Sequence, residues 1–447
     1  MNSLPTNDSM PVATKSRPLK VVLICHSDML GGASIVTYRL MQALRYEGVD
    51  ARMVVYTKIS NDSNVDVISS RGMRGFKFLV ERLRILVSNG FSRENLFKVS
   101  IANTGTAIHK HPWVAEADVI NLSWINQGLL SINGIRRLGS LGKPIVWTMH
   151  DMWNLTGICH HSYDCKGYKE SCGNCQFLTG LSGSDLSNKI HQRKKELYAG
   201  LNIHFVAVSN WLAGLCRQSS LLGDKPLSVI PNAFPINSFV TKPTHSITSF
   251  NIDYTRNIIV MGAARLDDPI KGLGYAIEAL NYIFDNHPEI ARTSTAVFFG
   301  DIRNPRKFDE LRFPHIHIGR INDQKVIRMI YAASKVVLST SLYETLPTTL
   351  IEGQASGCLA VTFGKGGQTD IVEHMKNGYI AEYRDAKSVA RGILWAFEQN
   401  VDRDALHESV RRRYASSEIA MEYISLYNDL LSKQNVSAQQ HSTSKKH

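Results

Sequence analysis

The stretch Ser341-Leu-Tyr-Glu-Thr-Leu-Pro-Thr-Thr-Leu-Ile-Glu-Gly-Gln-Ala-Ser-Gly357 carries two carboxylates on either side of a helix start. It follows the apolar run Val336–Ser339, which is typical of the end of a buried strand. Pro347 suits the first position of a helix that the final glycine would end. The pattern therefore predicts Glu344 in a strand-to-helix turn and Glu352 inside the helix.

Such a turn at the carboxyl edge of a parallel sheet is a common ligand site, because the first helical amides are unpaired and partly positive. These amides suit a phosphate. Nearby carboxylates instead accept hydrogen bonds from the hydroxyls of a ribose or a sugar ring. The alternative is that the two glutamates lie on a solvated surface, which is the commoner case for glutamates in general.

The whole chain has 447 residues, of which 43% are hydrophobic, enough for two domains with good cores. No apolar run approaches the roughly 20 residues that cross a bilayer, and residues 1–17 lack the apolar core of a signal peptide. A cytoplasmic location is therefore expected, with no transmembrane segment. The net charge of +12 is concentrated early: residues 1–250 hold 27 Lys and Arg against 16 Asp and Glu.

Part of this basic excess lies in residues 71–87, where apolar side chains recur at helical spacing between arginines and a lysine. The apolar positions are Phe76, Leu79, Val80, Leu83 and Leu86. This pattern predicts a basic amphipathic helix, which can lie on an anionic membrane surface. The alternative is a plain surface helix that covers the core. No nucleic-acid partner is expected, since no motif for DNA or RNA accompanies the charge.

Short apolar runs alternate with helical stretches along the chain, which predicts an α/β fold with two doubly wound, Rossmann-like parallel sheets. The strands expected in the first sheet are 20–25, 51–56, 119–122, 145–149 and 204–208. Those expected in the second sheet are 257–262, 296–300, 315–318, 335–339 and 359–362.

The domains expected from this pattern begin after a disordered N-terminus, residues 1–18. An N-terminal acceptor domain would cover 19–212 and a C-terminal donor domain 213–412. A terminal helix, 413–432, is expected to pack back on the N-terminal domain. The polar residues 433–447 have no core-forming pattern and are expected to be a disordered tail.

Two cations follow the first strand of the second sheet, in Gly262-Ala-Ala-Arg-Leu-Asp-Asp-Pro-Ile-Lys-Gly272. Arg265 and Lys271 would reach the same sheet edge as Glu344, where a planar guanidinium and a mobile ammonium suit a diphosphate. The alternative is a solvated loop in which the cations pair with Asp267 and Asp268.

Five short motifs, in their order along the chain, resemble those of the GT-B glycosyltransferases of glycosyltransferase family 4. These enzymes transfer sugar from a nucleotide diphosphate sugar with retained anomeric configuration. The resemblance covers about residues 20–431. The motifs are Gly31-Gly32, Pro231-Asn232, Arg265 with Lys271, Glu344 with Glu352, and Gly366-Gly367. It implies a GT-B fold, in which two such domains face each other across a cleft.

The resemblance also implies roles for single residues. Arg265 and Lys271 would hold the donor diphosphate and stabilise its charge. Glu344 would bind the transferred sugar, and Glu352 the ribose. Further donor contacts are implied at Gly31, Gly32, Ile321, Leu346, Pro347 and Thr348.

His150 and Asp151 end a predicted strand in Trp147-Thr-Met-His-Asp-Met-Trp-Asn154. A lone histidine at a strand end is most often structural. Family likeness implies instead that His150 touches the donor sugar or the reacting centre. Asp151 is an acceptor-side candidate or an orienter of His150.

The function implied is a retaining hexosyltransferase that acts on a saccharide or lipid-linked acceptor in bacterial polysaccharide, capsule, exopolysaccharide or O-antigen biosynthesis. The departing diphosphate would take the proton of the acceptor, so no divalent cation is expected to be required. A sugar-nucleotide epimerase, a phosphorylase-like enzyme and a non-catalytic carbohydrate- or nucleotide-binding subunit remain alternatives.

Four of the seven cysteines fall in one short segment, at Cys159, Cys165, Cys172 and Cys175. Four thiols in a cytosolic loop favour a structural zinc ion, with the last two as a two-residue knuckle. His160 or His161 could replace one sulfur. Free thiols and disulfides are the alternatives. The loop resembles one found in some bacterial exopolysaccharide and capsule glycosyltransferases of the family. Its position directly after the His150 segment suggests that it shapes the acceptor side.

Overall fold

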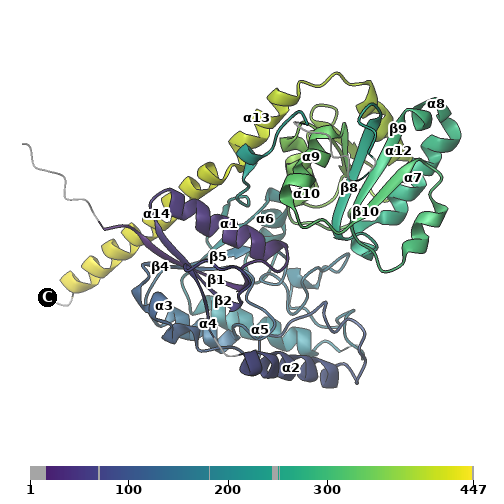
Figure 1. Cartoon of the computed structure of the whole chain (residues 1–447). Helices are drawn as coiled ribbons and strands as arrows, with labels where there is room; N and C mark the ends of the chain where they lie inside the picture. Colours follow the sequence, from purple (N-terminus) through teal and green to yellow (C-terminus); the bar gives the residue numbers. More distant parts are fainter. Residues whose placement is uncertain (1–16, 69–70, 181, 244–249, 251, 445–447) are drawn as a thin grey trace, which may run out of the picture.

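The computed structural model describes residues 17–68, 71–180, 182–243, 250 and 252–444, in two α/β domains (Figure 1). Each domain contains one parallel sheet. The seven strands of the N-terminal sheet run in the order β3-β2-β1-β4-β5-β6-β7, and the six strands of the C-terminal sheet in the order β10-β9-β8-β11-β12-β13. The predicted pair of doubly wound parallel sheets is confirmed.

The N-terminal sheet places helices on both of its faces. Its strands are β1 (Lys20–Ser27), β2 (Asp50–Thr57), β3 (Val65–Val67), β4 (Val119–Leu122), β5 (Ile145–Met149), β6 (Ile203–Ala207) and β7 (Leu227–Val229). Its helices are α1 (Gly32–Tyr46), α2 (Arg71–Ser88), α3 (Pro112–Glu116), α4 (Ile132–Gly139), α5 (Leu186–Ala199) and α6 (Asn210–Arg217).

The C-terminal domain repeats this construction. Its strands are β8 (Asn257–Arg265), β9 (Ser294–Asp301), β10 (His315–Gly319), β11 (Val336–Ser339), β12 (Leu359–Phe363) and β13 (Gly378–Ala381). Its helices are α7 (Leu273–Asn286), α8 (Pro288–Arg292), α9 (Gln324–Ala333), α10 (Thr348–Ala355), α11 (Gln368–Ile371), α12 (Ala386–Glu398) and α13 (Arg403–Tyr414). The helix predicted around Pro347 is α10, with this proline one position earlier than expected, as the N-cap.

Side chains alternate between the two faces of each sheet, so that every central strand contributes residues to two hydrophobic cores. In β1, Val21 and Leu23 pack with α1, whereas Val22 and Ile24 join the larger core on the opposite face. Because both faces of a parallel sheet are buried, the central strands are continuous apolar runs.

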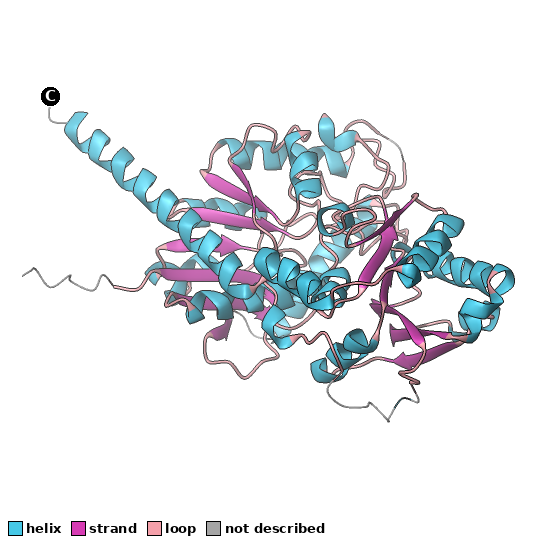
Figure 2. Ribbon diagram, turned by 90° about the horizontal axis from the view of Figure 1, so that it is seen from above, coloured by secondary structure: helices cyan, strands magenta, loops and turns pink. Residues whose placement is uncertain are grey.

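The last helix, α14 (Ser416–Ser444), leaves the C-terminal domain and runs along the N-terminal one (Figures 1 and 2). Two of its tyrosines reach buried polar groups of the N-terminal sheet. The Asn121 amide donates to the Tyr427 hydroxyl at 2.7 Å, and the Thr148 and Tyr423 hydroxyls lie 2.9 Å apart. This helix therefore connects the two domains by side-chain contacts as well as by the chain.

Three of the expected boundaries differ from the structure. A domain boundary at 212/213 would cut α6, and β7 pairs with β6 in the first sheet, so the N-terminal domain extends to Val229. The expected tail is helical as far as Ser444, because α14 continues past Leu431. Residues 1–16 and 445–447 lie outside the described residues, whereas Arg17 pairs with Asp118 at 2.6 Å.

The helix predicted over residues 71–87 is α2, but its faces are reversed. Glu81 and Arg82 point inward and are buried, with the Glu81 carboxylate accepting from the amides of Ile101 and Ala102 at 2.8 and 3.1 Å. Several apolar side chains point outward instead, among them Phe76, which is 63% exposed. The helix still packs on the larger core through Ile85, so the alternative of a surface helix that covers the core also remains open.

Candidate active site

A cavity of about 290 Å³ lies between the two domains, at the carboxyl edges of both sheets. Seven of the predicted site residues line it: Gly32, His150, Lys271, Glu344, Leu346, Pro347 and Thr348. They come from segments between residues 32 and 348, so only the fold brings them together.

The charged centre of this cavity is an ion pair between Lys271 and Glu344. The Lys271 ammonium, in the loop after β8, donates to the Glu344 carboxylate, in the turn after the neighbouring strand β11. Burial alone would lower the pKa of Lys271, but the carboxylate outweighs it and raises this pKa above its ordinary value. The lysine is therefore a cation at neutral pH, available to a ligand that carries negative charge.

The N-terminus of α10 adds positive character to the same wall. Pro347 precedes the helix, and Thr348 and Thr349 in its first turn line the cavity. No side chain caps this helix start. Because the first amides of a helix have no partner within the helix, they suit an anionic oxygen in the cavity.

Glu352 lies one turn further along α10, behind the cavity, where it meets the N-terminal domain. Its carboxylate is 3.8 Å from the Arg39 guanidinium of α1. Burial raises the pKa of Glu352, which Arg39 and Arg328 oppose. A ribose that used Glu352 would therefore share this carboxylate with Arg39, a residue that the sequence pattern did not indicate.

Arg265, at the end of β8, does not line the cavity. Its guanidinium donates to Asp268 at 2.7 Å and lies 3.6 Å from Asp267. This is the pairing that the alternative reading of the loop expected, although the Nε atom of Arg265 remains buried without a hydrogen-bond partner among the described residues. A diphosphate would have to replace Asp268 to use this guanidinium.

His150 lines the cavity from the end of β5. Its Nε2 atom is buried and has no hydrogen-bond partner among the described residues. Burial lowers the pKa of His150 to about 4, against the opposing effect of Asp151. His150 is thus neutral near pH 7, and its carbonyl accepts from the Thr345 hydroxyl of the facing domain at 2.8 Å.

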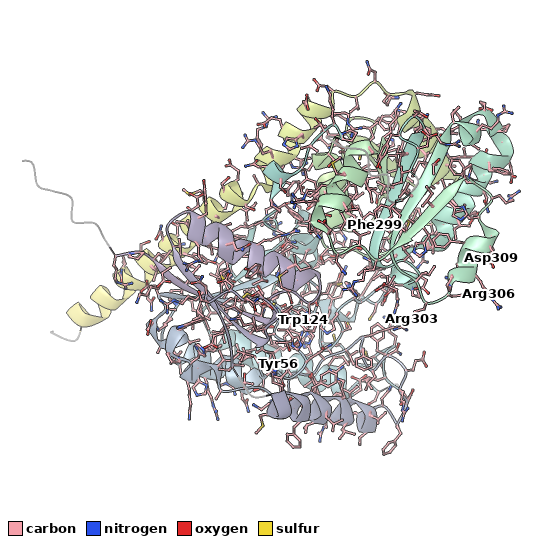
Figure 3. The ribbon with its side chains drawn as sticks, viewed as in Figure 1. Tyr56, Trp124, Phe299, Arg303, Arg306 and Asp309 are labelled. Atoms are coloured by element: carbon pink, nitrogen blue, oxygen red, sulfur yellow. The ribbon has the colours of Figure 1, made fainter. Side chains whose placement is uncertain are left out.

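Asp151 orients a different histidine from the one expected. It accepts from Trp124 Nε1 at 2.9 Å and lies 2.7 Å from His160 Nδ1. Burial would raise the pKa of Asp151, but His160 and the Trp153 amide lower it to about 2. Trp124 lies on the side of the N-terminal domain that faces the other domain (Figure 3). His160 is held by Asp151 and Ser100, and it does not line the cysteine cavity.

The two glycine pairs, Gly31-Gly32 and Gly366-Gly367, have different surroundings. Gly31 has a φ of 83° before α1, and a Cβ at Gly31 or Gly32 would meet nothing within 4 Å, so a ligand can approach there. Gly366 and Gly367 instead pack under the Glu344 turn: a Cβ on Gly367 would lie 1.9 Å from the Thr345 carbonyl oxygen. The absence of side chains at the second pair thus lets the protein's own backbone approach closely.

Two residues named above for other reasons also lie at or near the cavity. Asn232, from the segment between the domains, lines the cavity. His161 is half-buried, and its buried Nδ1 atom has no hydrogen-bond partner among the described residues. Desolvation lowers the pKa of His161, with further effects from Asp151, His160, Glu344 and Lys271. Ile321 packs against the larger core beyond β10 and does not line the cavity.

The predicted metal ligands are all free cysteines. In the described part of the chain, no three His, Cys, Asp or Glu side chains are already arranged to hold a metal ion. Cys159, Cys165, Cys172 and Cys175 nevertheless line one small cavity together.

Two Rossmann-like domains with a ligand-sized cavity between their carboxyl edges define the GT-B class of fold, as predicted. Among solved structures, the chain is similar to Anabaena HepE in complex with UDP and glucose. The two are 16% identical with a TM-score of 0.60, and the match covers 92% of this chain and 99% of that one.

Within this fold, residues 249–413 match the family described as Glycosyl transferases group 1. The phosphatidylinositol N-acetylglucosaminyltransferase gpi3 subunit of Schizosaccharomyces pombe is 22% identical, over 64% of this chain and 62% of its own length. An Escherichia coli UDP-Gal:alpha-D-GlcNAc-diphosphoundecaprenol alpha-1,3-galactosyltransferase is 24% identical, over 42% and 49%. The chain thus spans less than two thirds of either relative.

Three histidines with lowered pKa values make stability depend on pH. Burial lowers the pKa of His26, His150 and His191 to about 4. The unfolded chain therefore binds more protons than the folded one between about pH 6.5 and 4, and stability falls as pH falls through this window. We expect urea denaturation at pH 5 to show each histidine lowering the free energy of unfolding by about 1–2 kcal/mol relative to pH 7.5. The substitution His191→Gln should reduce the dependence of the free energy of unfolding on pH. An unchanged dependence would contradict the lowered pKa of His191.

Proposed function

We propose that the chain is a retaining glycosyltransferase of family 4, which moves a hexose or related sugar from a nucleotide diphosphate sugar to a saccharide or lipid-linked acceptor. The observation that carries this proposal is the cavity in which Lys271, Glu344, the start of α10 and the unpartnered Nε2 of His150 meet. A cation and helix amides suit a diphosphate, and the neighbouring carboxylate and imidazole suit sugar hydroxyls.

In this proposal the bond between the anomeric carbon and the diphosphate oxygen breaks while the acceptor oxygen bonds to the same face of the sugar. The acceptor hydroxyl gives its proton to the departing diphosphate oxygen, so no protein base is needed. Lys271 and the amides of α10 stabilise the charge that develops on the diphosphate. Arg265 joins them once it exchanges Asp268 for phosphate.

The relatives suggest the setting of the reaction. One is named for transfer to a diphosphoundecaprenol-linked sugar and another for N-acetylglucosamine transfer to phosphatidylinositol. We place the present chain by likeness in bacterial polysaccharide assembly, with an acceptor of saccharide or lipid-linked type.

The test is a screen of UDP-, GDP- and ADP-sugars by thermal shift, followed by turnover with saccharide and polyprenyl diphosphate acceptors. A donor present at about 100 times its Kd should stabilise the fold by roughly 2.7 kcal/mol. Acceptor-dependent release of nucleoside diphosphate, without added divalent cation, is expected. Interconversion of the donor without any acceptor would point to an epimerase, and binding of a donor without turnover would point to a binding subunit.

We also propose that α2 binds the surface of an anionic membrane, where a lipid-linked acceptor would lie. Of the described helices, none is long and apolar enough to cross a membrane. The outward face of α2 and the segment after it carry seven exposed apolar side chains: Met73, Phe76, Leu79, Leu83, Val87, Phe91 and Phe97. Residues 71–98 also hold seven Lys and Arg against two Glu, which suits anionic lipid.

Sedimentation with vesicles that contain phosphatidylglycerol tests this surface. The double variant Leu79→Ser/Leu83→Ser should weaken binding at least about 10-fold, because each apolar side chain withdrawn from the interface costs about 1–2 kcal/mol. The control is Met421→Ser, which removes an exposed apolar side chain from α14. Binding should fall at about 0.5 M salt. Equal sedimentation of wild type and double variant would refute the proposal.

A further inference from the structure

The four clustered cysteines converge on one cavity, although they are spread over 17 residues of chain. Cys159, Cys165, Cys172 and Cys175 all line a cavity of about 20 Å³, and none of them forms a disulfide. This volume admits one water-sized species, since a single water needs roughly 10–15 Å³. A water would need two to four polar partners, whereas four sulfurs are the ligand set of a soft metal ion.

Backbone donors already point at two of these sulfurs. The Gly157 amide donates to Cys172 Sγ at 3.3 Å, and the Gly167 amide donates to Cys165 Sγ at 3.4 Å. Such bonds stabilise negative charge on sulfur and orient it. A side chain at Gly157 is excluded, since its Cβ would lie 2.3 Å from the Ser187 carbonyl oxygen.

The chain between the last two cysteines is turned in a way that few residues adopt. Cys172, Gly173 and Asn174 have φ values of 54°, 109° and 47° in succession. The turn brings Cys175 back to the cavity that Cys172 lines. Non-glycine residues in this left-handed region cost free energy, so surrounding contacts must hold them there.

A buried lysine lies beside the cavity without an acidic partner. Lys194 on α5 is fully buried, and its ammonium donates to the carbonyls of Trp153 and Thr156 at 2.5 and 3.1 Å. Among the described residues, no carboxylate lies within ion-pair distance of it. Burial lowers the pKa of Lys194 well below its ordinary value, and Cys172, Cys159 and Asp151 oppose this shift. The ammonium also lies 3.3 Å from the centroid of the Trp153 ring. Thr156, whose carbonyl it contacts, lines the cysteine cavity, so negative charge on the four sulfurs would stabilise the ammonium.

We propose that Cys159, Cys165, Cys172 and Cys175 bind one zinc ion, and that Lys194 partly neutralises the resulting site. Each thiol loses its proton to solvent on binding, which leaves two net negative charges on the tetrathiolate. The thiols line the cavity without yet forming a coordination sphere, so binding requires rotation of their side chains.

The site would fix the loop that meets the C-terminal domain. Asp164, adjacent to Cys165, lies 3.2 Å from the Lys365 ammonium, and the Tyr163 and Tyr343 rings are 5.0 Å apart. Tyr343 directly precedes Glu344. A bound zinc would therefore hold one side of the cavity in place without touching a substrate.

The experiment measures metal in the full chain, purified without chelators or a polyhistidine tag, by elemental mass spectrometry. We expect about one zinc per chain. Cys172→Ser and Cys175→Ser should each lose most of it, whereas Cys216→Ala, a buried cysteine outside the cavity, should keep it.

A further variant keeps all four ligands and so separates metal affinity from loss of the thiols. Lys194→Met should release zinc to a chromogenic chelator at least about 10-fold faster than wild type, because the counter-charge is gone. Zinc well below about 0.1 per chain, iron in its place, or a mass lower by two hydrogens for each disulfide would overturn the proposal.

Discussion

Replacing Lys271 by alanine is expected to lower kcat/KM for sugar transfer by at least about 10³-fold, equivalent to roughly 4 kcal/mol of transition-state stabilisation. The lysine is the only Lys or Arg among the residues that line the interdomain cavity in the described part of the chain. Its loss also leaves the Glu344 carboxylate without its partner, so that a negative charge would face the diphosphate. Release of nucleoside diphosphate in the presence of acceptor is the measurement.

A matched control separates this effect from the loss of an ion pair in general. Arg312 and Asp285 form an exposed pair at 2.6 Å in the same domain, away from the cavity. Arg312→Ala should therefore leave kcat/KM unchanged and stability within about 0.5 kcal/mol. The variant Glu344→Gln should also lose transfer while it keeps the fold. Near-normal turnover in both Lys271→Ala and Glu344→Gln would show that the interdomain cavity is not the active site.

Replacing Gly367 by alanine is expected to lower activity indirectly, by displacing the turn that carries Glu344. The new Cβ would lie 1.9 Å from the Thr345 carbonyl oxygen, and the Gly367 amide donates to the Glu344 carbonyl at 2.8 Å. The turn that carries Glu344 must then move, although the φ of −67° at Gly367 is itself compatible with alanine. We expect kcat/KM to fall at least about 100-fold, because small displacements of positioning groups are costly.

The same substitution should lower the free energy of unfolding by about 1–3 kcal/mol in urea denaturation, as overpacking does elsewhere. Gly274→Ala in α7 is the control, because a Cβ there meets nothing within 4 Å and alanine favours helix. That variant should be active and at least as stable as wild type. Unchanged kcat/KM in Gly367→Ala would mean that the turn tolerates the shift.

The central strands could be predicted because they are buried on both faces and therefore consist of consecutive apolar residues. The expected limits of β4 and β5 coincide with the structure. The short strands β3, β7 and β13 were missed. The segments VDV and LSV hold only two apolar residues each, and GYIA begins at a glycine, which is typical of a turn. Two of these three are edge strands of the first sheet, where one side has no neighbouring strand.

Helical spacing predicted α2, but it could not tell which face turns inward. The two faces differ little in apolar content because Ile85 lies on the buried side and Leu83 on the exposed side. The choice was made by Glu81 and Arg82, whose bonds to the backbone of residues 96–102 satisfy a loop that lacks secondary-structure partners. Those partners lie at least 14 residues away, beyond the reach of a local pattern.

By itself, the amino-acid sequence determined the two parallel sheets and the local groups that follow their strands, including Lys271, Glu344 and the four cysteines. These are consequences of apolar periodicity and of turn chemistry over a few residues. The tertiary structure decided which groups meet: Lys271 with Glu344, Arg39 with Glu352, Asp151 with His160, and Lys194 beside the cysteine cavity. Such pairings depend on how two domains pack, and that packing is a sum over many distant contacts that no single stretch of sequence records.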